Sequence, residues 1–303
     1  MGIARTLAEM IVREHLYRPI RGKLLLIGRQ TVQLSRQDAI DMVRDFGVDT
    51  RGIGIDDLDV DRQTVRAGQE RDEEFITDDS FFRLLGATDV AWLDHSDYEG
   101  ANIIHDLNLP IPEELDEYAD FIIDGSTFDN VFSPGDAMRN IARLLKPNGR
   151  VFTINQASNH HLPYLIFTAH WFLDYFVMNR FSDCKIYHVI LAPNSPWLIF
   201  SFDYDAFAKD QPPIPNISVD TEMGVVAFAE KGADSRWDVV PNQQHYRSDA
   251  DWKVFAENLA LLKKSERPFQ ACNQVQLANV ENLHGYQFLP LAAPAGRLAV
   301  AQA

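Results

Sequence analysis

Apolar runs of strand length alternate with segments of helical periodicity through the middle of the chain. We predict strands at apolar runs that end in glycine or a polar residue, namely 24–28, 89–94, 102–108, 119–126 and 150–155. Between them, apolar residues recur every three or four positions at about 36–46, 80–86 and 136–147, which predicts helices. This alternation is typical of a doubly wound α/β sheet with parallel strands.

The flanking segments add further elements to this pattern. Three more strands are predicted at 184–192, 196–204 and 223–232, and the proline-containing segments between them favour antiparallel strands at one edge of the sheet. Amphipathic periodicity predicts a helix before Pro19 and others at 168–181 and 251–264. We therefore expect an N-terminal helix in residues 1–23, a sheet domain in 24–232, and a C-terminal helical extension and tail in 233–303.

Residues 49–79 form a charged insertion with few apolar positions. Such a composition predicts an exposed acidic loop, either a passive insertion or a lid over a ligand. A calcium site is the alternative interpretation of the carboxylates within it, but the central glycine and closing glutamate of an EF-hand loop are missing. The four carboxylates concerned are Asp56, Asp57, Asp59 and Asp61.

Composition narrows the class of protein. The 303 residues carry 28 Lys and Arg against 44 Asp and Glu, a net charge of −16 without a basic cluster, so a nucleic-acid partner is not expected. Two cysteines without ligand spacing predict neither a disulfide framework nor a zinc site and favour a reduced, cytoplasmic setting. The most apolar stretch, beginning at Leu162, contains His170 and Asp174 and falls short of a transmembrane segment.

Candidate ligand-binding residues follow the predicted strands. Ligands of open α/β sheets bind beyond the carboxyl ends of the strands, and polar residues stand there at Gly28 to Gln30, Asp94, Asp106 and Asp124. An acidic side chain such as Asp94 can accept hydrogen bonds from both hydroxyls of a ribose. Asp106 can accept from an adenine amino group beside a backbone donor at Leu107. Alternatively, both aspartates are capping or turn residues.

Two pairs of segments carry a family resemblance. SDYEGA with HDLN, and DGSTFDNVF with LLKPNGR, resemble class I S-adenosylmethionine-dependent methyltransferases, and more narrowly methyltransferase-like proteins associated with cell-surface polysaccharide biosynthesis. The resemblance covers residues 24–189 and implies a Rossmann-like sheet that binds S-adenosylmethionine. It implies that Asp94 holds the ribose, that Asp106 and Leu107 face adenine, and that Asp124 with Gly125 lies near the methionine end.

The loop after the first strand departs from the common pattern of this fold. It usually carries two or three glycines, whereas GRQTVQL retains Gly28 alone. Arg29 and Gln30 would then turn outward or contact the methionine carboxylate, for which a guanidinium is a suitable partner. In the alternative interpretation Arg29 blocks the site and methyl transfer has been lost.

The acceptor side is expected just past residues 150–155. His160 and His161 stand there as candidate general bases, with a structural role as the alternative. The sequence thus predicts methyl transfer to oxygen or nitrogen of a small-molecule or sugar-containing acceptor, with a glycan precursor among the candidates. A catalytically inactive binding or scaffold protein is the alternative, and self-association stays open. A dinucleotide enzyme is disfavoured because GxGxxG is absent.

Overall fold

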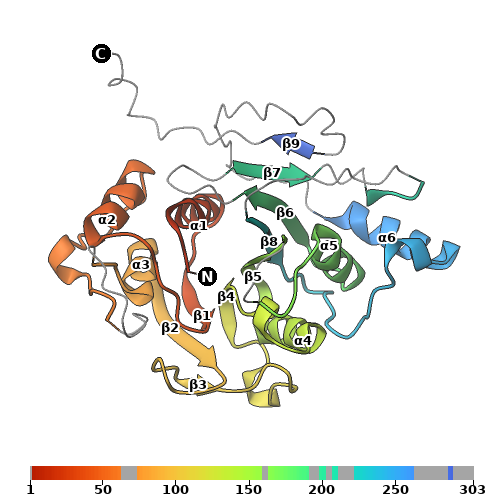
Figure 1. The fold of residues 1–303 in the computed structure, drawn as a ribbon, viewed down its shortest axis with the longest axis horizontal. Helices are drawn as coiled ribbons and strands as arrows, with labels where there is room; N and C mark the ends of the chain where they lie inside the picture. The colour runs from red at the N-terminus through yellow and green to blue at the C-terminus, as the bar shows by residue number, and fades with distance from the viewer. Residues whose placement is uncertain are drawn as a thin grey trace, which may run out of the picture.

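The structure is a computed structural model of the chain. It describes residues 2–62, 74–158, 163–190, 198–202, 207–210, 222–262 and 286–288. The chain forms one mixed sheet with helices on both faces (Figure 1).

Within the described residues the sheet has nine strands, in the order β3-β2-β1-β4-β5-β8-β6-β7-β9. The strands are β1 (Gly22–Ile27), β2 (Ala87–Asp94), β3 (Ile103–Ile104), β4 (Ala119–Gly125), β5 (Leu145–Gln156), β6 (Asp183–Ile190), β7 (Leu198–Phe202), β8 (Met223–Glu230) and β9 (Tyr286–Phe288). The strands β1 to β5 are parallel, and β8 is antiparallel to both of its neighbours, β5 and β6. β7 pairs antiparallel with β6 and with β9. The expected architecture is confirmed: a Rossmann-like doubly wound sheet with antiparallel strands at one edge.

The helices form a layer on each face of the sheet. α1, α2 and α3 lie on one side in Figure 1, and α4, α5 and α6 lie on the other. Their bounds are α1 (Arg5–Tyr17), α2 (Arg36–Asp45), α3 (Asp78–Leu85), α4 (Pro134–Leu144), α5 (Ala169–Met178) and α6 (Asp249–Leu261), with single 3-10 turns η1 (Ile55–Asp57), η2 (Glu113–Leu115), η3 (Phe128–Asn130) and η5 (Gln244–Tyr246). Each layer buries its own apolar cluster against the sheet, because successive residues of a strand point to opposite faces. No helix in the described part of the chain is both long and apolar enough to cross a membrane.

Local sequence signals explain where several helices begin and end. Ser35 accepts a hydrogen bond from the Asp38 amide at 3.0 Å and so caps α2. Thr77 does the same for α3 through the Ser80 amide at 3.1 Å. Gly86 ends α3 with φ +97°, a left-handed conformation that favours glycine. These caps fix how the chain enters and leaves the elements beside the site.

The charged insertion is more closely packed than the sequence predicts. Asp56, Asp57 and Asp59 are exposed as expected, but Asp61 and Asp78 are buried. The insertion also contributes apolar Leu58 and Ile76 to a core cluster, and a bridge joins Val60 to Ile76. The expectation of a solvated loop throughout is therefore wrong for the two ends of the insertion, where scattered apolar residues suffice to hold it to α2 and α3.

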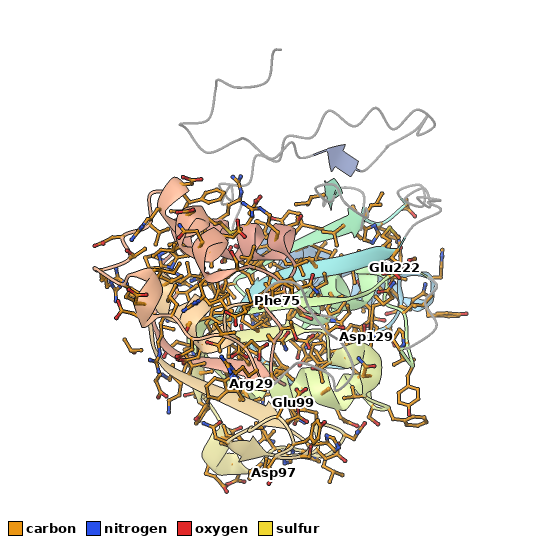
Figure 2. All side chains as sticks on the ribbon, turned by 60° about the vertical axis from the view of Figure 1, so that its left-hand side comes forward. Arg29, Phe75, Asp97, Glu99, Asp129 and Glu222 are labelled. Atoms are coloured by element: carbon orange, nitrogen blue, oxygen red, sulfur yellow. The ribbon has the colours of Figure 1, made fainter. Side chains whose placement is uncertain are left out.

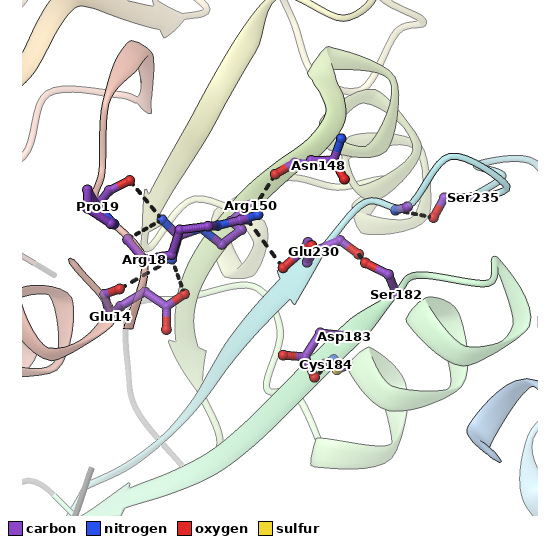
Figure 3. A network of polar contacts seen from close by, with 11 residues as sticks. Glu14, Arg18, Pro19, Asn148, Arg150, Ser182, Asp183, Cys184, Glu230 and Ser235 are labelled. Atoms are coloured by element: carbon purple, nitrogen blue, oxygen red, sulfur yellow. Dashed lines mark hydrogen bonds and ion pairs between the residues drawn. The ribbon is translucent and has the colours of Figure 1, made fainter. Parts of the chain in front are cut away.

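A buried ionic network attaches α1 to the sheet (Figure 3). Arg150 of β5 pairs with Glu14 of α1, and the two side chains are 4% and 0% exposed. Nη2 of Arg150 also donates to the Arg18 carbonyl at 2.6 Å. Arg18 in turn lies 3.2 Å from a carboxylate oxygen of Glu230 in β8. The first helix is thereby joined to two central strands as well as to the apolar core.

Candidate functional site

The strand order reverses between β1 and β4, and this position marks the candidate site. From β1 the chain continues outward to β2 and β3 and then returns to the other side of β1 as β4. Ile27 is opposite both Leu93 of β2 and Asp124 of β4, so the carboxyl ends of the three strands meet at one edge. In open α/β sheets such a switch point is where ligands bind.

A cavity of about 430 Å³ opens at this edge. It is lined by residues that follow β1, β2, β3 and β4: Ile27, Gly28, Leu93, Asp94, His95, His105, Asp106, Leu107, Asn108, Ser126, Thr127, Asn130 and Val131. The cavity brings together four of the residues predicted from the sequence, Gly28, Asp94, Asp106 and Leu107. The four others, Arg29, Gln30, Asp124 and Gly125, do not line it.

Gly28 allows the backbone to turn directly above Asp94. Its φ is +72°, and its amide donates to the Leu93 carbonyl at 2.8 Å. A Cβ at this position would lie 3.4 Å from Oδ2 of Asp94 and would carry the strain of the left-handed conformation. A side chain at position 28 would thus be strained and would extend toward Asp94 and the cavity, which explains why glycine suits this position.

Asp94 presents a partly exposed carboxylate to the cavity. Its side chain is 29% exposed, and Oδ1 accepts from the His95 amide at 2.6 Å and lies 3.0 Å from Nδ1 of His95. These contacts engage Oδ1, while Oδ2 lies toward Gly28. The carboxylate is therefore oriented by its neighbour and remains accessible to hydroxyl donors.

The loop after β3 is built around Asp106 and Leu107. Oδ1 of Asp106 accepts from the Asn108 amide at 2.9 Å and from its side chain at 2.7 Å, and these bonds lower the pKa of Asp106. The Leu107 carbonyl accepts from Nδ2 of Asn140 in α4 at 3.0 Å. Buried Leu107 forms an apolar wall beside the exposed carboxylate. This arrangement suits a flat ring with an amino group at its edge.

Arg29 turns away from the cavity. Its guanidinium lies 3.0 Å from Oδ1 of Asp78 and 4.2 Å from the centre of the Trp92 ring. The side chain is only 9% exposed although it lies at the centre of this edge of the molecule (Figure 2). Arg29 therefore neither blocks the cavity nor contributes a charge to it.

Gln30 is buried next to the end of β4. Its amide donates to Oδ2 of Asp78 at 2.9 Å, and its side-chain Nε2 donates to the Ile27 carbonyl at 3.0 Å. Oε1 is buried and has no hydrogen-bond partner among the described residues. A Cβ on Gly125 would lie 2.7 Å from this oxygen, so Gly125 gives it room. A buried acceptor without a donor is costly unless a ligand or water supplies one.

Asp124 is fully buried and engaged within the protein. Oδ2 accepts from Oγ1 of Thr153 at 2.5 Å and Nδ2 of Asn155 at 3.0 Å, while Oδ1 accepts from the Thr127 amide at 2.6 Å. Burial raises its pKa to about 6. Asp124 thus fixes the turn after β4 to β5, and the ligand side of this turn is formed by Ser126 and Thr127.

Sequence reasoning did not assign a role to a second buried carboxylate, Asp129. Its Oδ2 accepts from the Gln156 amide at 3.1 Å, and burial raises its pKa. Nε2 of Gln156 is buried without a hydrogen-bond partner in the described part of the chain. Because Asp129 stands in a 3-10 turn and Gln156 at the end of a strand, only tertiary structure brings them together. The predicted bases His160 and His161 lie outside the described residues.

Another cavity, of about 440 Å³, lies between α4, α5 and residues 239–245. Its walls include Trp171 and Tyr175, and Asp174 in it is already paired with Arg247. None of the residues that follow β1, β2 or β3 reaches it. The cavity at the switch point is therefore the better candidate for a nucleotide-like ligand.

No protein-family model and no curated protein matches the chain. Among solved structures, the citrinin polyketide synthase CMeT domain has a TM-score of 0.38 at 9% identity, covering 75% of this chain and 52% of that one. A Burkholderia thailandensis 1,6-didemethyltoxoflavin-N1-methyltransferase, solved with S-adenosylhomocysteine, has a TM-score of 0.37 at 14% identity, covering 74% and 76%. A Thermotoga maritima protein described as a possible histamine N-methyltransferase has a TM-score of 0.31 at 13% identity, covering 75% and 89%.

The Thermotoga maritima protein is described as an S-adenosylmethionine-dependent methyltransferase, and the Burkholderia thailandensis protein is a methyltransferase by name. The chain spans about half the length of the polyketide synthase domain. The TM-scores of all three structures are below 0.5.

Proposed function

We propose that the chain is an S-adenosylmethionine-dependent methyltransferase that acts on oxygen or nitrogen of a small-molecule or sugar-containing acceptor. The observation that carries this proposal is the cavity at the switch point, which Gly28, Asp94, Asp106 and Leu107 line together. S-adenosylmethionine supplies an electrophilic methyl group on a sulfonium.

The adenosine half of the cofactor fits the residues around the cavity. Asp94 offers a partly exposed carboxylate for the ribose hydroxyls, next to a glycine that leaves space above it. Asp106 offers an exposed carboxylate for an exocyclic amine, and Leu107 offers an apolar surface for the ring. Hydrogen bonds to a charged acceptor are among the stronger ones in proteins, so the two carboxylates that line the cavity give a ribose and a base distinct anchors.

At the methionine end, Oε1 of Gln30 is a buried acceptor in need of a donor. The primary ammonium of the methionine moiety is such a donor. Oε1 lies against Gly125, where a Cβ would stand 2.7 Å from it. The guanidinium of Arg29 is committed to Asp78, so it does not serve the methionine carboxylate. This end of the site therefore relies on an amide oxygen where the common loop relies on glycines.

The chemical demand on the protein is mainly positional. Methyl transfer is an in-line displacement, and alignment alone is worth roughly 7–11 kcal/mol in favourable cases. When the acceptor is a hydroxyl, a proton must leave as the methyl arrives, and a protonated nitrogen must lose its proton before it can attack the methyl group. His160 or His161 accepts that proton in this proposal, since both follow the end of β5 in sequence.

The proposal is tested by isothermal titration calorimetry with S-adenosylmethionine and S-adenosylhomocysteine. Asp94→Ala removes the ribose acceptor, and we expect it to weaken both ligands by about tenfold or more, since a hydrogen bond to a charged group contributes about 1.5–3 kcal/mol. Asp97→Ala is the matched control because Asp97 is exposed, close in sequence and outside the cavity lining. No binding by the wild type at millimolar ligand overturns the proposal, and equal affinity of the wild type and Asp94→Ala overturns the ribose assignment.

A further inference from the structure

Asp78 is a buried carboxylate at the start of α3 that contacts the loop after β1. It is 1% exposed and is the first residue of the helix that follows the charged insertion. Oδ2 accepts from the Gln30 amide at 2.9 Å and from the indole Nε1 of Trp92 at 3.0 Å. Oδ1 lies 3.0 Å from the Arg29 guanidinium and accepts from the Asp79 amide at 2.8 Å. Nothing in the proposed cofactor contacts uses this side chain.

These contacts fix Arg29 and Gln30, the two residues that follow Gly28 in the loop. The ion pair and the Trp92 ring hold the Arg29 charge away from the cavity. The bond to the Gln30 amide fixes the backbone from which that side chain starts, and Nε2 of Gln30 is bound to the Ile27 carbonyl. Oε1 is consequently left as the free end of Gln30, at the position beside Gly125. A glycine-rich loop has no side chains to control, whereas this loop has two that require an external anchor.

We propose that Asp78 is a positioning residue for the methionine end of the cofactor, acting through Gln30 and Arg29. The inference rests on the proposed function, because the ligand it serves is the primary ammonium of the methionine moiety. It also gives the charged insertion a role, since Asp78 joins the end of that segment to the cofactor loop. The adenosine anchors Asp94 and Asp106 make no contact with Asp78, so the two halves of the site are separable by experiment.

Two ligands distinguish positioning from general support of the fold. S-adenosylhomocysteine contains the ammonium, and adenosine lacks it. We expect Asp78→Asn to raise the dissociation constant of S-adenosylhomocysteine by about tenfold or more and to leave that of adenosine unchanged. Asparagine retains the volume but removes the charge that holds Arg29. Asp79→Asn is the matched control, because Asp79 is the adjacent carboxylate of the same helical turn and pairs with Arg83 at 2.8 Å.

Two further variants keep the proposal testable when Asp78→Asn folds poorly. Gln30→Ala removes the Oε1 acceptor directly, and we expect the same loss for S-adenosylhomocysteine with adenosine binding retained. Asp78→Glu keeps the charge, and we expect it to recover part of the affinity. The Trp92 indole resonance in a ¹H–¹⁵N spectrum should shift in Asp78→Asn and stay unchanged in Asp79→Asn, because only Asp78 accepts from that group.

The outcomes separate this inference from the proposed function. Wild-type protein that binds neither ligand overturns both. Wild-type protein that binds both ligands, with Asp78→Asn and Gln30→Ala weakening them equally or not at all, overturns the positioning role and leaves the proposed function standing. A selective loss of S-adenosylhomocysteine affinity in these variants, absent in Asp79→Asn, supports it.

Discussion

The carboxyl group of Asp124 is held in its protonated form over an unusual pH range. Burial raises its pKa to about 6, although Thr153, Asn155 and the Thr127 amide all donate to it. Desolvation of the charge therefore outweighs three hydrogen bonds. The pKa of an aspartate is near 4 when the chain is unfolded. Between about pH 4 and pH 6 the folded state therefore binds the proton more tightly than the unfolded state does.

This difference predicts a pH dependence of stability with a defined sign. The stabilising contribution of protonated Asp124 is fully present below about pH 4 and is lost as the pH rises through about 6. A shift of about two pKa units corresponds to about 3 kcal/mol. The free energy of unfolding of the wild type should therefore fall over this interval relative to that of Asp124→Asn, in which the group does not titrate.

Urea denaturation of both proteins at pH 4, 5, 6 and 7 measures this difference. The contribution of the second buried carboxylate, Asp129, is common to both proteins and largely cancels. Parallel curves of unfolding free energy against pH would contradict the assignment of the shift to Asp124.

At the residue scale, the sequence predicted position better than role. Gly28, Asp94, Asp106 and Leu107 line one cavity, as expected for residues that follow neighbouring parallel strands. Their positions could be predicted because the apolar runs that precede them show where the strands end. Asp124 follows the same rule, yet its side chain faces the interior. The inward direction depends on Thr153 and Asn155, which belong to the next strand of the sheet. Asp78 carried no distinguishing signal, since an acidic residue early in a helix is common.

At the element scale, α1 shows why some contacts are invisible to periodicity. Its apolar face predicted the helix, and that face is buried in the core. The ion pair between Glu14 and Arg150 joins residues 136 positions apart, and no local sequence pattern predicts such a pairing. Both side chains are nearly inaccessible to water, so removal of one charge leaves the other buried without an ionic partner.

We expect Arg150→Met to lower the free energy of unfolding by about 3–5 kcal/mol, the usual cost of an uncompensated buried charge. The double variant Glu14→Leu with Arg150→Met should be more stable than Arg150→Met alone, because it also removes the buried Glu14 carboxylate that Arg150→Met leaves without its ionic partner. Lys253→Ala is the control: its partner Glu257 is 4.0 Å away and both are largely exposed, so the change should stay below about 1 kcal/mol. Urea denaturation distinguishes these cases, and a double variant no more stable than the single one would contradict this account.

At the scale of the whole molecule, helices from distant parts of the chain complete the two apolar clusters. α1 contributes to the cluster on one face of the sheet, and Phe255 of α6 contributes to the cluster on the other. Phe255 is 1% exposed and lies under the guanidinium of Arg247, 4.0 Å from it. The domain boundaries drawn from the sequence at 23 and 232 thus fall between segments that share these clusters.

Shared clusters predict that the sheet and both end helices unfold together. We expect Phe255→Ala to lower the free energy of unfolding of the whole protein by about 3–5 kcal/mol, as for other buried phenylalanines. In each of the two proteins, circular dichroism and tryptophan fluorescence should give the same urea midpoint, and this midpoint should be lower in the variant than in the wild type. Loss of α6 at low urea with the main transition unchanged would show instead that the extension is an independent unit.

The position of β8 determines when β6 can be joined to strands β1 to β5 during synthesis. β8 lies between β5 and β6 and pairs with both, yet it follows both in the chain. As the polypeptide leaves the ribosome, β1 to β5 can assemble early, whereas β6 has no direct pairing with them until residues 223–230 emerge. The facing edges of β5 and β6 are therefore open to wrong partners for that interval. A strand that is made after both of its neighbours and inserted between them places this folding step after the synthesis of residues 223–230.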